Sequence, residues 1–220
     1  MQRLELDAGR RFADVGLQSI ADDPPSGHDG LLGYINDQAA WMAIDEHSQA
    51  AIGYAVSTVV DGEAHLDQVS VSMAAAGRGV GSLLVAEVFD WAVRRGYDAI
   101  TLTTFRDLAW NGPLYERLGF VVLTDTECGP ELLLIRAQER SRGIDVLPRI
   151  AMRRLLRPAT KRALNASRSQ TLLHSRRKKR GTIHKRLVIE VVTRIVNRCL
   201  VCIVAIAQQQ ITTRHPFQHE

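Results

Sequence analysis

The sequence predicts an α+β fold, with a central mixed, mainly antiparallel sheet and helices on both of its faces. Three strand-like segments, at 39–44, 50–60 and 64–73, follow one another through short polar turns, which is typical of an antiparallel meander. The third segment is followed by a glycine-rich turn, a helix and another strand, which indicates a crossover between parallel strands. Of the 220 residues, 45% are apolar and 24% are charged. This balance excludes collagen-like, wholly disordered and polytopic membrane proteins.

Ahead of the strands, residues 2–13 are expected to be part of a helix, because apolar residues recur among charged ones. Prolines and a glycine make 22–27 a loop, and 30–38 is expected to form a short helix.

After the meander, the turn at 77–81 begins a helix. Its apolar residues are spaced to share one face: Leu84, Val88, Trp91 and Ala92. Gly96 is expected to end this helix. The remaining predicted elements are a strand at 99–104, a helix at 111–118, a strand at 120–123, a helix at 130–142 and a strand at 149–155.

The net charge of +4 combines two unlike parts. Residues 1–156 contain 14 arginines and no lysine against 22 acidic residues, a net charge of −8, whereas 157–220 contain 14 basic and two acidic residues, a net charge of +12. The asymmetry predicts a folded domain over 1–156 and a basic tail over 157–220.

The tail contains a basic run at 176–180 and a segment at 187–207 that is expected to form an amphipathic helix. The longest apolar run in this segment is too short to span a bilayer, so weak association with an anionic membrane surface is one interpretation. A plain solvated tail is another, and a segment produced by a shifted reading frame is a third. No aromatic residue interrupts the basic run, so nucleic acid is not an expected partner.

Three cysteines, Cys128, Cys199 and Cys202, are too few to indicate a disulfide framework or a zinc site, and no metal is expected. The amino terminus has no signal-peptide pattern, so a cytoplasmic location is expected.

The segment Ala76–Ser82 has three glycines in five residues just before a helix. Backbone amides that are free of Cβ obstruction, together with the positive end of a helix dipole, suit a phosphate or pyrophosphate group. A tight packing turn is the alternative. No Gly-Lys-Ser/Thr follows, so this is not a P-loop, and the preceding hairpin disfavours a dinucleotide-binding fold.

Two blocks, AHLDQVSVSMAAAGRGVGSLLV at 64–85 and TLTTFRDLAWNGPLYERLGF at 101–120, resemble the GNAT superfamily of acyl-CoA N-acyltransferases. The resemblance covers roughly residues 1–156. It implies the GNAT fold, acetyl-CoA as co-substrate and direct acetyl transfer to a primary amine on a small molecule or peptide, with a homodimer as a further expectation. Members usually begin with a strand that is absent here, so an exposed sheet edge is expected. A non-catalytic acyl-CoA-binding module or an inactive truncated homologue is the alternative.

The resemblance also assigns residues to the cofactor. The backbone of Val69, Ser70 and Val71 would pair with the pantetheine arm. The pyrophosphate loop would comprise Gly77, Arg78, Gly79, Val80, Gly81 and Ser82. The family's opening Gln or Arg is replaced by Ala76. Asn111 either contacts the cofactor amide or caps the helix that follows.

For the chemistry, the resemblance points to His65 and Asp67 as the titratable pair that deprotonates the amine, and to Tyr115 as the general acid for the leaving thiolate. Two residues apart on a strand, His65 and Asp67 are expected to share a face. An ordinary histidine pKa of about 6.5 suits a base and an ordinary tyrosine pKa of about 10 suits an acid. Which of His65 and Asp67 is the base stays open, as does a purely structural role for each of the three residues.

Overall fold

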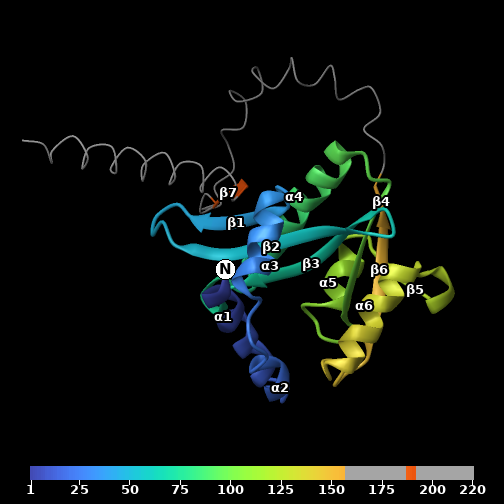
Figure 1. Cartoon of the computed structure of the whole chain (residues 1–220). Helices are drawn as coiled ribbons and strands as arrows, with labels where there is room; N and C mark the ends of the chain where they lie inside the picture. Colours follow the sequence, from blue (N-terminus) through green and yellow to red (C-terminus); the bar gives the residue numbers. More distant parts are fainter. Residues whose placement is uncertain (157–186, 192–220) are drawn as a thin grey trace, which may run out of the picture.

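The computed structural model describes residues 1–156 and 187–191. A seven-stranded sheet, in the order β5-β6-β4-β3-β2-β1-β7, forms the centre of the molecule (Figure 1). The strands are β1 (Ala40–Asp45), β2 (Ala51–Val60), β3 (Glu63–Val71), β4 (Ala99–Phe105), β5 (Val121–Leu123), β6 (Arg149–Leu155) and β7 (Leu187–Val191). Only β3 and β4 pair in parallel, and the other neighbouring strands pair antiparallel. This confirms the α+β class and the mainly antiparallel sheet.

The helices are α1 (Gln2–Ala13), α2 (Gln18–Ala21), α3 (His28–Asn36), α4 (Val80–Arg95), α5 (Gly112–Arg117) and α6 (Pro130–Ser141). Gly96 ends α4 with φ +84°, a left-handed conformation that suits glycine and was expected from the sequence. The strand expected to reach Met73 ends at Val71 instead, because Met73–Ala75 form a short 3₁₀ turn. The helix expected at 30–38 begins and ends two residues earlier.

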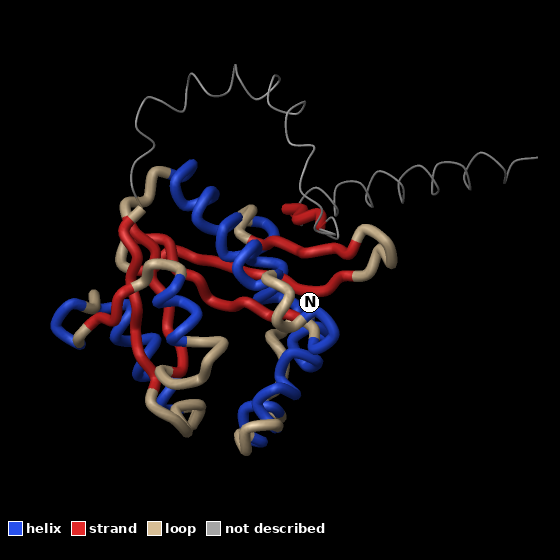
Figure 2. Tube along the Cα trace, turned by 180° about the vertical axis from the view of Figure 1, so that it is seen from behind, coloured by secondary structure: helices blue, strands red, loops and turns tan. Residues whose placement is uncertain are grey.

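Strand β2 shows how the helices cover both faces of the sheet (Figure 2). Tyr54 and Val56 pack with Leu4 of α1 and with residues of α3, whereas Ala55, between them, packs into the cluster formed by α4. Helix α5 joins the α4 side through Tyr115. Helix α6 covers the other side, where its apolar residues contact the far end of β2. The alternation along β2 therefore separates two apolar layers.

The parallel pairing of β3 with β4 is short. It covers only 64–66 of β3 against 100–102 of β4. Immediately afterwards, Asp67 forms a β-bulge, because Leu66 faces Ser57 and Gln68 faces Val56 while Asp67 has no partner on β2. Beyond the bulge, Val69–Val71 pair with β2 alone among the described strands. One backbone edge of β3 is thus left facing the gap between the diverging strands.

Strand β7 corrects two expectations from the sequence. Leu187–Val191 form a strand, not the start of a helix, and pair antiparallel with Trp41–Asp45 of β1. Their β-branched residues favour extended backbone over helix. The edge expected to be exposed is therefore covered along β1. The rest of the predicted helix, the basic run at 176–180 and the Cys199/Cys202 pair lie outside the described residues.

Among the helices that the structure describes, none combines the length and apolarity needed to cross a membrane.

Candidate active site

Two cavities meet beside the gap between β3 and β4. The first, which we call the acidic cavity, has a volume of about 250 Å³ and is enclosed by α1, α2 and the strands β3, β4 and β6. The second, the loop cavity, has a volume of about 510 Å³ and lies between α1, α5 and the glycine-rich loop. Five residues line both cavities: Ala8, Phe12, Val69, Asn111 and Tyr115. The two cavities are therefore neighbouring halves of one site.

The loop cavity is built to receive an anion. Gly77 and Gly79 have φ of +73° and +80°, values that residues other than glycine rarely adopt, and Gly79 is the N-cap of α4. The first-turn amides of α4 have no partner within the helix and point toward this end, where the helix dipole is positive. Arg11 and Arg117 add positive charge to the wall. The guanidinium of Arg11 lies 4.0 Å above the ring of Trp110, which orders it.

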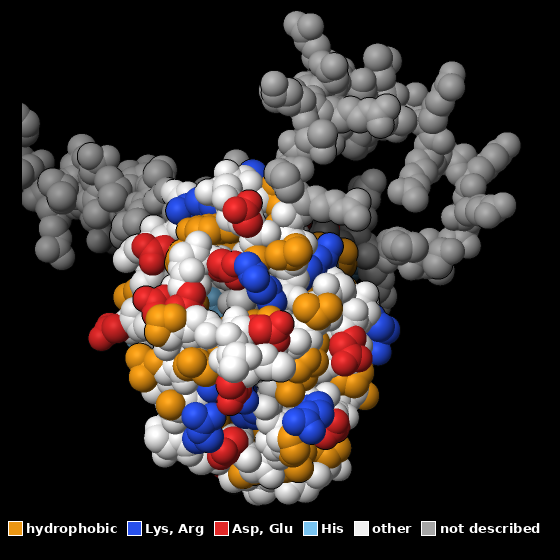
Figure 3. Space-filling view, turned by 90° about the vertical axis from the view of Figure 1, so that its right-hand side faces the viewer, with side chains coloured by type: hydrophobic (Ala, Val, Ile, Leu, Met, Phe, Trp, Pro, Cys, Tyr) orange, Lys and Arg blue, Asp and Glu red, His pale blue; other side chains and the backbone are white. Residues whose placement is uncertain are grey.

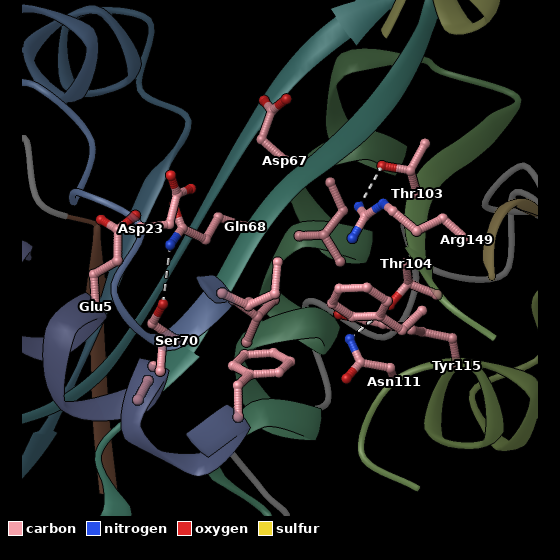
Figure 4. Close-up of a pocket in the computed structure, with 18 of the residues that line it drawn as sticks. Glu5, Asp23, Asp67, Gln68, Ser70, Thr103, Thr104, Asn111, Tyr115 and Arg149 are labelled. Atoms are coloured by element: carbon pink, nitrogen blue, oxygen red, sulfur yellow. Dashed lines mark hydrogen bonds between the residues drawn. The ribbon is translucent and has the colours of Figure 1, made fainter. Parts of the chain in front are cut away.

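Asn111 connects the two halves. It lies at the N-cap of α5, but its side chain makes no capping hydrogen bond there. Instead, Nδ2 donates to Thr104 Oγ1 at 2.7 Å, and Oδ1 is buried without a partner in the described part of the protein (Figure 4). A buried acceptor without a partner is costly, so this oxygen is suited to an N–H donor brought by a ligand.

Gly112 sets the position of Asn111 and of α5. A Cβ at this position would lie 2.2 Å from the carbonyl oxygen of Arg106, so only glycine allows the chain to turn this closely. The close approach holds the start of α5 against the end of β4, and Tyr115 follows one helical turn later.

Tyr115 lies at the junction of the cavities with its ring edge-on to Phe120, at a centroid distance of 5.6 Å. Burial raises the pKa of its phenol to about 12. The hydroxyl therefore stays protonated across the physiological range, as a proton donor requires.

Asp67 is the titratable residue of β3 that reaches the acidic cavity. Its side chain is 22% exposed. Burial raises the pKa of the carboxyl to about 7, against a smaller lowering effect from the hydroxyl of Tyr34. A carboxyl that titrates near neutral pH can accept a proton from an amine and release it again.

His65 does not line either cavity, which corrects its placement beside the reacting groups. It is 2% exposed, and its Nδ1 lies 2.8 Å from Thr101 Oγ1 on β4. Burial lowers the pKa of the imidazole to about 4, so it is neutral at pH 7. Its Nε2 lies 4.0 Å from Asp67 Oδ1. His65 is thus a buried neighbour of the cavity residue Asp67.

Arg78 also lies away from the site. Its guanidinium is 3.8 Å from Asp45 Oδ2 on β1, and its side chain does not line the loop cavity. By contrast, the remaining residues expected at the cofactor are brought together: Val69, Val71, Gly77, Gly79, Val80, Gly81, Ser82 and Asn111 line the loop cavity, and Ser70 lines the acidic one.

Several lining residues were not predicted from the sequence. Arg11 and Arg117 belong to the loop cavity, while Glu5, Asp23 and Arg149 belong to the acidic one. The two arginines of the loop cavity come from α1 and α5, far apart in the chain. Arg117 lies within the second motif block, whereas Arg11 lies on a predicted helix far from both blocks, and neither position differs in sequence from that of a solvated arginine.

No metal site is indicated in the described ranges 1–156 and 187–191, which contain no group of three or more His, Cys, Asp or Glu residues that could hold an ion. On the side of the molecule drawn in Figure 3, acidic and basic side chains of the described residues are interspersed, without a continuous basic patch.

The joined cavities place a glycine-rich loop that suits an anion next to a cavity lined by Glu5, Asp23 and Asp67. Residues 17–120 match the model of the acetyltransferase (GNAT) family. The match confirms the predicted resemblance to GNAT acetyltransferases over this segment, which contains Asp67, the glycine-rich loop, Asn111 and Tyr115 of the site.

Several solved structures are similar to this chain. The PaiA N-acetyltransferase of Thermoplasma acidophilum, in complex with coenzyme A, is 13% identical with a TM-score of 0.50, over 70% of this chain and 89% of that one. A GNAT-family acetyltransferase of Staphylococcus aureus Mu50 is 17% identical with a TM-score of 0.47, over 71% and 96%. N-acetylglutamate synthase of Neisseria gonorrhoeae, in complex with coenzyme A and N-acetyl-glutamate, is 19% identical with a TM-score of 0.49. That match covers 70% of this chain but only 32% of the synthase.

Proposed function

We propose that this protein is an N-acetyltransferase that moves the acetyl group of acetyl-CoA directly to a primary amine. The observation that carries the proposal is the meeting of the two cavities at Val69, Asn111 and Tyr115. Because these residues line both halves, a donor in the loop cavity and an acceptor in the acidic cavity would present their reacting ends at the same place.

The residues present fit acetyl-CoA. The left-handed glycines and the first amides of α4 suit its pyrophosphate, with Arg11 and Arg117 for further phosphate charge. The open backbone edge of Val69–Val71 suits an extended amide-containing arm, and the buried Oδ1 of Asn111 suits one of its N–H groups. When bound, acetyl-CoA supplies an activated acetyl thioester.

Asp67 acts as the general base. An amine is mostly protonated at pH 7 and must lose its proton before its nitrogen can attack a carbonyl carbon. The Asp67 carboxyl, with its pKa raised to about 7, accepts that proton directly or through one water. His65 acts only through Asp67, because it lies 4.0 Å behind the carboxyl and outside the cavity.

Tyr115 acts as the general acid. Transfer forms a C–N bond and breaks the C–S bond, which leaves a thiolate that needs a proton. The protonated hydroxyl of Tyr115 donates it. The attacking nitrogen loses its second proton as the amide forms, and this proton restores the hydroxyl of Tyr115, while the first proton, held by Asp67, leaves to solvent. No cysteine lies among the residues lining the two cavities, which agrees with direct transfer rather than an acyl-enzyme.

The test is an acetyl-CoA turnover assay on a panel of primary amines, combined with calorimetric titration of coenzyme A. We expect coenzyme A binding and amine-dependent thiol release, with turnover lowered at least tenfold in Tyr115→Phe and in Asp67→Asn while coenzyme A still binds. Binding without turnover on any amine would favour a non-catalytic acyl-CoA-binding module. Wild-type rates in both variants would remove the roles assigned here.

A further inference from the structure

The residues that line the acidic cavity indicate which class of acceptor it binds. We propose that the acceptor is a short diamine, with one amine that reacts beside Tyr115 and a second, cationic amine held at the opposite wall by Glu5 and Asp23. This inference rests on the proposed acetyl transfer and specifies the substrate class of the same site.

Glu5 places a carboxyl group on this wall. Its carboxylate accepts hydrogen bonds from Tyr54 Oη at 2.9 Å and from Ser26 N and Oγ at 3.1 and 3.2 Å. All three donors are neutral, so they fix the carboxylate in place without cancelling its charge. The hydroxyl of Ser26 also approaches Gln68 of β3, which ties the wall to the sheet. A fixed, partly buried carboxylate favours a cationic partner.

Asp23 adds a second carboxylate on the same side, in the loop that follows α2. Its partner, Arg142 of the segment after α6, lies 3.0 Å away with a side chain that is 60% exposed. Such an exposed pair is weak, because solvent screens it and the arginine retains rotational freedom. A ligand cation inside the cavity would therefore compete well for the inner oxygen of Asp23.

The described residues lining the acidic cavity include no unpaired basic side chain that could bind a carboxylate ligand. Arg149 is the one basic residue among those lining it. Its guanidinium donates through Nε and a terminal nitrogen to both oxygens of Glu139, at 3.0 and 2.6 Å. It also donates to Thr103 at 3.3 Å (Figure 4). This two-point pair is largely buried, with side chains 15% and 13% exposed. Arg149 is therefore already neutralised, and an amino-acid acceptor would leave its carboxylate without a partner.

The two carboxylates of the wall and the residues at the reacting end lie on opposite sides of the acidic cavity. In Figure 4, Glu5 and Asp23 lie on one side of the cavity, while Tyr115 and Asn111 lie across it, where the loop cavity begins. A volume of about 250 Å³ is that of roughly eight waters, which suits a chain of a few methylenes with an amine at each end.

Three acceptors of matched length test the inference in the full chain: 1,5-diaminopentane, n-pentylamine and 5-aminopentanoate. We expect kcat/KM for the diamine to exceed that for pentylamine by about 10- to 100-fold, the range of a hydrogen-bonded charge pair, with 5-aminopentanoate the poorest. In Glu5→Gln and in Asp23→Asn the ratio of diamine to pentylamine should fall toward one. Asp22→Asn, which removes a neighbouring carboxylate that does not line the cavity, should keep the ratio.

A second readout separates this inference from the proposed transfer reaction. Calorimetric titration of 1,5-diaminopentane into the protein saturated with coenzyme A measures acceptor binding without turnover. Diamine binding that weakens in Asp23→Asn supports the inference even if no amine is acetylated, in which case only the proposed transfer fails. Turnover with equal kcat/KM for the diamine and pentylamine overturns the inference and leaves the transfer reaction standing. A protein that does not bind the diamine but acetylates other amines overturns the inference alone, and one that neither binds the diamine nor acetylates any amine of the panel overturns both.

Discussion

Replacing Asp67 with asparagine tests the chemistry of the site most directly. The substitution keeps the size and shape of the side chain but removes the group that accepts the proton of the amine. Asp67 lines the acidic cavity, and burial raises the pKa of its carboxyl to about 7. Positioned general bases contribute roughly 10²- to 10⁴-fold to rate, so we expect kcat/KM to fall by about that factor at pH 8.

The pH dependence gives a sharper expectation. A base works only when it is deprotonated, so a carboxyl with a pKa of about 7 loses activity as the pH falls through 7. It is about one-tenth ionised at pH 6 and about nine-tenths ionised at pH 8. The ratio of wild-type to Asp67→Asn kcat/KM should therefore be roughly tenfold larger at pH 8 than at pH 6. The acceptor amine titrates equally in both assays, so its own ionisation cancels in this ratio.

The assay is thiol release from acetyl-CoA at several pH values, with His65→Gln as the matched variant. His65 lies outside both cavities, and its pKa of about 4 keeps it neutral throughout this range. We therefore expect the inflection near pH 7 to persist in His65→Gln and to vanish in Asp67→Asn. The opposite pattern would refute the assignment and make His65 the base.

Three further predictions concern the framework. Asp61→Ala removes the carboxylate that accepts hydrogen bonds from two first-turn amides of α6, at 2.9 and 3.0 Å. It should lower the free energy of unfolding by about 1–2 kcal/mol in urea titrations. Asp61→Asn should recover part of the loss, and a fully stable alanine variant would contradict the capping role. Gly112→Ala forces a Cβ against the Arg106 carbonyl and should cost about 1–3 kcal/mol and reduce turnover, whereas unchanged kinetics would show that α5 can shift freely. Met42 and Glu190 are paired in the register of β1 and β7. In a chain free of other cysteines, the double variant Met42→Cys, Glu190→Cys should form a disulfide within one chain, detected by peptide mass mapping. A bridge between two chains, or no bridge, would contradict the pairing.

Much of the framework could be predicted because its signals are local. The Asp61–Gly62 turn, with φ of +52° and +75°, joins β2 to β3 where the sequence indicated it. Gly96 ends α4 for the same kind of reason, since a left-handed residue is needed there. The loop glycines were recognisable because their backbone conformation excludes most side chains. In each case the residue type itself carries the conformational requirement.

The walls of the acidic cavity could not be predicted, because they depend on contacts between distant parts of the chain. Glu5 reaches Tyr54 across 49 residues, and Asp23 meets Arg142 across 119. Neither carboxylate differs in sequence from an ordinary solvated one. The pairing of β7 with β1 was missed for a related reason. A segment with many β-branched residues becomes a strand only when an open sheet edge is available, and the sequence does not show which edge it will find.

The bulge at Asp67 explains why strand periodicity misjudged the catalytic pair. Alternation predicts that His65 and Asp67 share a face, and their side chains are indeed neighbours at 4.0 Å. The extra residue in β3, however, comes directly after the last pairing with β4, and such an insertion bends a strand and increases its twist. His65 therefore stays inside the paired region, beside Thr101, whereas Asp67 lies where the strands separate and the cavity begins. One irregularity thus opens the gap that suits the cofactor arm and separates a neutral buried imidazole from a carboxyl that titrates near pH 7.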